Sequence, residues 1–199
     1  MAAVLAPNGL FPTSTPRQQF GASVNTLDQA RAYYGGLKDK ACLEASRSLR
    51  SSLGIDVRIR RVGRSAHEQV RDHWMRAGRH ADAGWDWEEI FRRHREPKCL
   101  DLAIWSPDSS SLIALALATM TMEAATLRYC EGNPQDGCDY KGKRVLIALE
   151  AVANYALGAG LSEIRIDPVN EKLASLYQTV YGFELVAPKK GPAYYRKGI

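Results

Sequence analysis

Hydrophobic residues recur along this chain at two spacings, which together predict a protein of mixed α-helices and β-strands. Alternating apolar and polar residues indicate strands with one buried face at residues 55–62 and 162–167. Apolar residues three and four positions apart indicate helices, most clearly at residues 145–157. The other expected elements are a helix over 27–53 that Tyr34-Gly35-Gly36 divides, helices that Ser65 and Asp86 begin, and strands at 99–105, 112–121, 125–131, 183–186 and 193–196.

The order of these elements predicts an α+β fold with a mixed sheet. From residue 55 onward we expect a strand, two helices, three strands, a helix, a strand, a helix and two strands. A chain of 199 residues accommodates one such domain with an extension before it. We therefore interpret residues 1–25 as a flexible leader, residues 26–54 as an N-terminal helical extension, and residues 55–199 as the main domain.

Composition narrows the class of protein without naming its function. No apolar run reaches the roughly 18 residues that a membrane-spanning helix needs, and no secretory signal is expected, so we expect a cytoplasmic protein. The polar leader leaves secretion as an effector open. The net charge of +5 fits either a basic surface or an anionic ligand or partner. No CxxC pair is present and the four histidines complete no zinc spacing, so no metal site is predicted.

Residues 170–183 are the most informative stretch. Asn170 can cap a helix, and Gly182 then ends it before Phe183 opens an apolar strand. With the strand at 162–167, the segment is strand, Asn-capped helix, Gly-Phe and strand. It resembles the second signature of the GNAT family of N-acetyltransferases, and the element order from residue 55 is similar to that of the family. The helix positions with large apolar or aromatic side chains are Leu173, Leu176, Tyr177 and Val180.

This resemblance implies a GNAT-like fold, with acetyl-CoA as cosubstrate and direct transfer of the acetyl group to a primary amine. It places Asn170 beside the coenzyme A arm, where the residue would both cap the helix and contact the cofactor. It places Tyr177 near the thioester as the acid that protonates the leaving thiolate. The spacing from Tyr177 to Gly182 is one residue longer than the common family spacing, so Tyr181 is the alternative acid.

Residues 139–145 correspond to the family's pyrophosphate loop, whose pattern is Arg/Gln-x-x-Gly-x-Gly/Ala. Only the first glycine of that pattern is present here, and cations surround it at the start of the following helix. Cations there oppose the helix dipole, and a bound polyanion would offset them, although a solvated basic turn is the alternative. The cofactor-binding residues that the resemblance implies in this loop are Lys141, Gly142, Lys143, Arg144 and Val145.

The end of the strand at 125–131 would lie beside the pantetheine arm. The resemblance implies that the backbone N–H of Cys130 or Glu131 polarises the thioester carbonyl. Glu131 is also a candidate base for the amine, with Glu123 as the alternative, since either carboxylate can accept the proton directly or through water. Direct transfer in the family disfavours Cys130 as a covalent nucleophile.

The acceptor side in this fold is formed by the first two helices and the last hairpin. Trp85 and Trp87 flank Asp86 there, and could hold the stem and cationic head of an amine. Equally, the two Trp side chains could anchor a contact between helices. Neighbouring candidates for the same surface are Trp74, Glu88 and Glu89.

Several functions stay open at this level. The acceptor could be a small molecule or a protein, and a homodimer is compatible with the sequence. A toxin or nucleic-acid-directed acetyltransferase, acting for example on aminoacyl-tRNA, is an alternative that the net charge supports but does not favour. A non-catalytic binding module is a third, because the glycine pattern is degenerate. The arginines that could contact nucleic acid are Arg58, Arg60, Arg61, Arg64, Arg71, Arg76, Arg79, Arg92, Arg93 and Arg95.

Overall fold

The computed structural model describes residues 26–74, 84–135, 140–167 and 171–199. Within these residues, seven strands form one sheet in the order β1-β2-β3-β4-β5-β7-β6. Neighbouring strands are antiparallel except β4 and β5, which are parallel. The strands are β1 (Arg58–Arg60), β2 (Leu100–Trp105), β3 (Leu112–Met120), β4 (Ala125–Gly132), β5 (Glu163–Ile166), β6 (Glu184–Val186) and β7 (Tyr194–Gly198).

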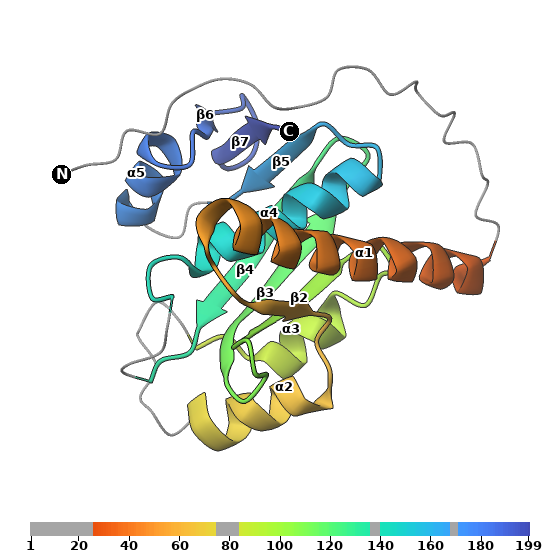
Figure 1. Ribbon diagram of the computed structural model, residues 1–199. Helices are drawn as coiled ribbons and strands as arrows, with labels where there is room; N and C mark the ends of the chain where they lie inside the picture. Colours follow the sequence, from red (N-terminus) through yellow and green to blue (C-terminus); the bar gives the residue numbers. More distant parts are fainter. Residues whose placement is uncertain (1–25, 75–83, 136–139, 168–170) are drawn as a thin grey trace.

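Helices cover both faces of this sheet (Figure 1). On one face α1 and α4 lie side by side, and on the other α2 and α3 pack beneath β2 and β3. None of the helices in the described segments is long and apolar enough to cross a membrane. The helices are α1 (Leu27–Leu53), α2 (Arg64–Gln69), which continues into a π-helical turn (Val70–Trp74), α3 (Trp87–Arg93), α4 (Arg144–Gly158) and α5 (Glu171–Thr179).

Strand alternation divides the apolar side chains between two cores. On β2, Leu102 and Ile104 belong to the core under α1 and α4, whereas Ala103 and Trp105 face α2 and α3. Trp74 is fully buried in the second core. The α+β fold and the order of elements that the sequence predicts are therefore confirmed.

The predicted break in the first helix is wrong, because α1 runs unbroken through Gly35 and Gly36. Its start is fixed by a capping box, in which the Thr26 hydroxyl accepts from the Gln29 N–H at 3.2 Å and the Gln29 side chain accepts from the Thr26 N–H at 3.1 Å. A buried stripe ending at Leu49 packs on the sheet and α4. Two glycines cost a helix only about 1 kcal/mol each, which this packing outweighs.

Replacing Gly36 with alanine is expected to raise the free energy of unfolding by about 0.5–1 kcal/mol, because a Cβ there meets no atom within 4 Å and alanine restricts the unfolded chain. Urea denaturation measures the change. Gly54→Ala is the matched control and should destabilise the protein, since Gly54 ends α1 with a φ of 63°. An unchanged or lower stability of Gly36→Ala would contradict this account of the helix.

Three smaller predictions also need correction. The helix expected to begin at Ser65 begins one residue earlier: α2 follows Gly63 without a side-chain cap, and Glu68 pairs with Arg64 at 2.8 Å. The first strand spans only the three residues of β1. Val180, which the sequence groups with Tyr177 among the helix positions, lies just after α5 and is 64% exposed.

Candidate functional site

Strands β4 and β5 separate halfway along β4. Their pairing runs from Ala125 opposite Ile164 to Leu127 opposite Ile166, yet β4 continues to Gly132. At the point of separation β4 contains one extra residue relative to β3, Arg128, which forms a bulge. Arg128 pairs with Asp167, directly after β5. The second half of β4 therefore has an edge that β5 does not cover.

The ladder between β3 and β4 determines which backbone groups face this opening. The Asn133 N–H donates to the Ile113 carbonyl at 2.8 Å, and in the same register Glu131 lies opposite Leu115. Bonded pairs alternate along an antiparallel ladder, so Glu131 directs its N–H toward β3. The N–H of Cys130 consequently points toward the uncovered edge, which distinguishes the two residues that the sequence left as alternatives.

Cys130 and two tyrosines of the last helical segment meet on the face that α4 covers. Tyr177 is 2% exposed and packs its ring edge-on against Tyr195, with a centroid distance of 5.7 Å. Tyr181 stacks on Tyr177 at 6.4 Å and is less buried. Both phenols lie close enough to Cys130 to interact with it electrostatically. The structure thus brings both candidate acids to the uncovered part of β4.

Burial controls the protonation of these groups. It raises the pKa of the Cys130 thiol to about 12, and the nearby Glu131 adds to the effect while Arg144 opposes it. Burial, and after it the neighbouring Cys130, also raises the pKa of Tyr177. Cys130 is therefore a thiol at neutral pH and a poor nucleophile, in agreement with the expectation of direct transfer. Tyr177 is a neutral phenol that can donate a proton.

Glu131 faces the opposite side of the sheet from Cys130, as strand alternation requires. It is 2% exposed, and its Oε2 accepts a hydrogen bond from the Trp87 indole at 2.6 Å. Trp87 is itself buried and stacks on Phe91 with a centroid distance of 5.3 Å. Trp85 is partly exposed and meets the Tyr129 ring edge-on at 5.0 Å. The candidate base is thus positioned by the helix layer on the α3 face.

The other candidates near this layer have structural partners. The Asp86 carboxylate caps α3 by accepting from the Glu89 N–H at 3.0 Å, as the sequence predicts. Glu89 pairs with Arg92 and Arg93, and Glu88 is exposed. Between the two tryptophans, Asp86 therefore serves as a helix cap. Trp74 is a fully buried core residue.

Glu123, the alternative base, precedes β4 and lies at the far end of that strand from Glu131. It is an exposed partner of Arg165 at 3.0 Å. It is therefore remote from the opening between β4 and β5. Asn170 lies outside the described residues, and so does Cys138, whereas Cys130 is a free thiol.

The loop before α4 has an unusual backbone. Tyr140 and Gly142 both adopt positive φ angles, of 64° and 84°. Such a conformation is uncommon for an aromatic residue, and it is held by the Tyr140 hydroxyl, which donates to the Asp56 carbonyl at 2.9 Å. Within the described residues no side chain caps α4, and its first turn contains no acid. Lys141 and Lys143 are exposed beside the first backbone N–H groups of α4, which no side chain caps. Val145 packs against the core.

Arg144 is oriented differently from its cationic neighbours. Its guanidinium donates to the Asn133 carbonyl at 2.9 Å and crosses Gly132, where an added Cβ would lie 1.9 Å from Nη1. The Arg144 Nε is buried without a hydrogen-bond partner among the described residues. Arg144 thus lies against the end of β4, close to Cys130, instead of extending beyond the start of α4.

No protein-family model and no curated protein matches this sequence. Solved structures do. The chain is similar to an acetyltransferase of the GNAT family from Listeria monocytogenes 4b F2365, with a TM-score of 0.52, 16% identity, and coverage of 74% of this chain and 97% of that chain. It is also similar to the ribosomal-protein-S18-alanine N-acetyltransferase from Escherichia coli, with a TM-score of 0.52, 15% identity, and coverage of 72% and 94%.

The chain has the GNAT fold. The GNAT-like fold that the resemblance implies is therefore confirmed. In this chain α1 precedes β1 and lies on the α4 face of the sheet.

Two residues of the GNAT-fold site escaped the sequence reasoning. Tyr140 holds the loop before α4 through a contact across 84 positions, and Gly132 makes room for Arg144. For Gly132 a signal existed, because a glycine at the end of a strand often marks a close approach of another group. No such signal in the sequence existed for Tyr140, since its hydrogen-bond partner is a backbone carbonyl.

Proposed function

We propose that this protein is an N-acetyltransferase that transfers an acetyl group from acetyl-CoA directly to a primary amine of a small molecule or a protein. The observation that carries the proposal is the uncovered edge of β4 beside Cys130, with Tyr177 on one face of the sheet and Glu131 on the other. A thioester in this opening would be reached from both faces, one by the acid and the other by the amine.

The residues around the opening fit the parts of acetyl-CoA. The start of α4, with its uncapped N–H groups and exposed Lys141 and Lys143, suits the pyrophosphate. The uncovered edge of β4 offers backbone groups to the amides of the pantetheine arm. Arg144, lying against the end of β4, would contact that arm, whereas Gly142 shapes the loop and Val145 contributes a backbone N–H. Asn170 remains a proposed cofactor contact.

The proposed chemistry uses one group for each proton and charge. Glu131 takes a proton from the ammonium, directly or through water, while the Trp87 indole holds its carboxylate in place. The amine nitrogen then forms a bond to the thioester carbon, and the Cys130 N–H stabilises the oxyanion. The carbon–sulfur bond breaks, the leaving thiolate takes the Tyr177 proton, and the former amine nitrogen releases its second proton to solvent water, which leaves a neutral amide. Trp85, partly exposed on the acceptor side, is the proposed contact for the amine substrate.

Titration calorimetry with acetyl-CoA tests the cofactor site. The native protein is expected to bind one equivalent, and Lys141→Glu with Lys143→Glu is expected to weaken binding at least about tenfold, because two cations beside the pyrophosphate become anions. Lys189→Glu with Lys190→Glu is the matched control, since both lysines are exposed between β6 and β7, and it should bind like the native protein.

The outcomes separate the alternative functions. Absence of binding by the native protein would reject acetyl transfer and leave a non-catalytic module with a GNAT fold. Binding that survives reversal of Lys141 and Lys143 would reject the position of the pyrophosphate but not the activity. Product formation with a panel of amines and peptides, followed by mass spectrometry, then defines the acceptor class.

A further inference from the structure

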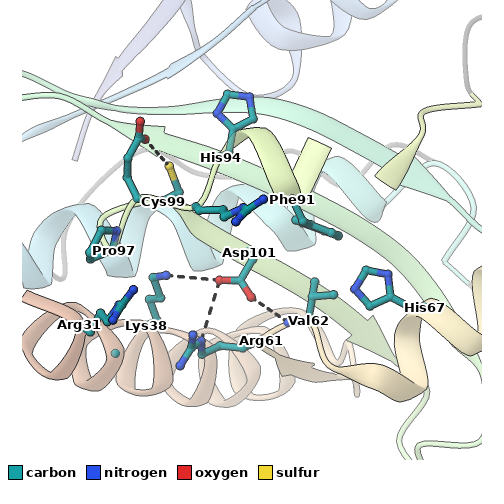
Figure 2. Close-up of a pocket in the computed structure, with 13 residues that line it drawn as sticks. Arg31, Lys38, Arg61, Val62, His67, Phe91, His94, Pro97, Cys99 and Asp101 are labelled. Carbon is teal, nitrogen blue, oxygen red and sulfur yellow. Dashed lines mark hydrogen bonds and ion pairs between the residues drawn. The ribbon is translucent and has the colours of Figure 1, made fainter. Parts of the chain in front are cut away.

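A pocket with a volume of about 430 Å³ lies at the edge of the sheet where β1 ends and β2 begins (Figure 2). Trp105, at the other end of β2, lies opposite Leu112, close to the pair formed by Ala114 and Gly132 at the open end of β4. The start of β2 therefore lies toward the closed end of β4. The pocket nevertheless adjoins the proposed acetyl-transfer site, because Phe91 of its wall stacks on Trp87 at 5.3 Å and His94 meets Tyr129 at 5.8 Å. A volume of about 300–1,000 Å³ is usual for small-molecule sites.

The pocket has a surplus of positive charge. Arg31, Lys38, Arg61 and Arg95 line it together with only two carboxylates. One of these, Asp101, is already engaged: it pairs with Lys38 at 3.3 Å and with Arg61 at 3.9 Å. Counting both carboxylates against the four cations leaves two positive charges even with both lining histidines neutral. A ligand carrying two negative charges would offset this surplus.

The second carboxylate is also engaged. Glu96 accepts a hydrogen bond from the Cys99 thiol at 3.1 Å, within the turn that leads into β2. Its neighbour Arg95 donates from Nε to the Arg92 carbonyl at 2.8 Å, which leaves the two terminal nitrogens of the guanidinium for a ligand. Neither lining acid is therefore free to neutralise Arg95. Arg31 pairs with Asp28 at 3.3 Å, but this carboxylate is exposed and does not line the pocket.

The cations converge from different elements. Figure 2 shows Arg31, Lys38 and Arg61 on one side of Asp101, and Phe91 and His94 on the other. Lys38 is only 5% exposed, so its charge acts in a poorly solvated environment.

One polar group in the wall lacks a partner. The Nε2 atom of His94 is buried without a hydrogen-bond partner in the described part of the chain. Phe91 and Pro97 add apolar surface to the same wall, which suits an organic group attached to the anion.

The pocket depends on α1, which supplies part of its wall. Arg31, Gly35 and Lys38 all belong to α1. A Cβ on Gly35 would lie 3.9 Å from Nη1 of Arg61, so the guanidinium passes directly over this glycine. The pocket is thus formed where α1 packs against the end of β1.

We propose that this pocket binds a small-molecule phosphate monoester. A phosphate dianion matches the surplus of two charges, and its oxygens match the paired donors of guanidinium groups better than the two oxygens of a carboxylate do. Arg61 and Arg95 would hold the phosphate, with Arg31 at the rim, and Phe91 would contact the organic part. The proposal does not depend on acetyl transfer, because the two sites share no residue.

Calorimetry with phenyl phosphate at constant ionic strength tests this site. The native protein is expected to bind one equivalent, and more tightly than it binds benzoate, which carries the same ring on a carboxylate. Arg61→Gln with Arg95→Gln is expected to weaken phenyl phosphate binding at least about tenfold. The control, Arg47→Gln with Arg93→Gln, removes two exposed arginines outside the pocket and should change affinity by less than about twofold.

Backbone amide NMR shifts of the native protein give a readout that does not depend on any variant folding. Phenyl phosphate is expected to shift the amides of Gly35 and Cys99, and saturating coenzyme A should leave that titration unchanged. Shifts confined to Lys143 and its neighbours would place the anion at α4 and overturn the proposal. So would absence of saturable binding, equal affinity for benzoate, or undiminished affinity of the double variant.

Discussion

Replacing Tyr177 with phenylalanine is expected to lower turnover by about 100-fold while the affinity for acetyl-CoA stays unchanged. The hydroxyl is the proposed proton donor to the leaving thiolate, and burial keeps its pKa raised, so the native group is protonated throughout the neutral range. Phenylalanine keeps the ring packing against Phe183 and Tyr195, and the fold should therefore be preserved. Steady-state kinetics with acetyl-CoA and an accepted amine measure kcat and KM separately.

Tyr181→Phe is the matched control, because this second phenol lies beside the same cysteine but is less buried. It should lower kcat by less than about threefold if Tyr177 is the acid. A large loss in Tyr181→Phe with native turnover in Tyr177→Phe would transfer the role to Tyr181. Native turnover in both variants would remove tyrosine from the proton transfer altogether.

Replacing Asp101 with alanine is expected to lower the free energy of unfolding by about 3 kcal/mol. The Lys38 side chain is 7% exposed and pairs with Asp101 at 3.3 Å, so the variant leaves a buried cation without its partner. The same carboxylate accepts from the Val62 N–H at 3.0 Å, directly after β1. The substitution therefore weakens both the packing of α1 on the sheet and the end of the edge strand β1. Urea denaturation measures the change in the free energy of unfolding.

A double variant distinguishes an unpaired charge from general damage. Lys38→Met with Asp101→Ala should be more stable than Asp101→Ala alone, because no charge is then left buried. Glu44→Ala breaks an exposed ion pair with Arg47 on the same helix and should change stability little. A double variant as unstable as Asp101→Ala would contradict the electrostatic explanation and assign the loss to the Val62 contact.

Much of the fold could be predicted from the sequence because its signals are local. The helix over 145–157 and the segment from Asn170 to Phe183 each carry periodicity and end signals within about a dozen residues. The failures are also local. Gly35 and Gly36 suggested a break in α1, because the pattern does not include the packing that α1 gains from the sheet and α4. Ser65 suggested a helix start, but α2 begins one residue earlier and Glu68 pairs with Arg64.

The candidate site was predictable as a set of residues but not as an arrangement. Alternation along β4 requires Cys130 and Glu131 to face opposite sides, and the family resemblance named Tyr177. The sequence could not identify the hydrogen-bond partner of Glu131, because Trp87 is 44 positions away along the chain. Nor could it distinguish Arg144 from Lys143 at the start of α4, since their different orientations depend on the space that Gly132 leaves.

Local patterns were enough to predict most of the elements, their order and a set of candidate site residues, since periodicity, caps and turns act between close neighbours in the chain. Which faces meet depends on packing between distant segments. Lys38 and Asp101 lie 63 positions apart along the chain, and their ion pair forms only because α1 packs beside the end of β1. The phosphate pocket that we propose arises from that contact, because cations that are dispersed along the chain converge only when the helix packs there.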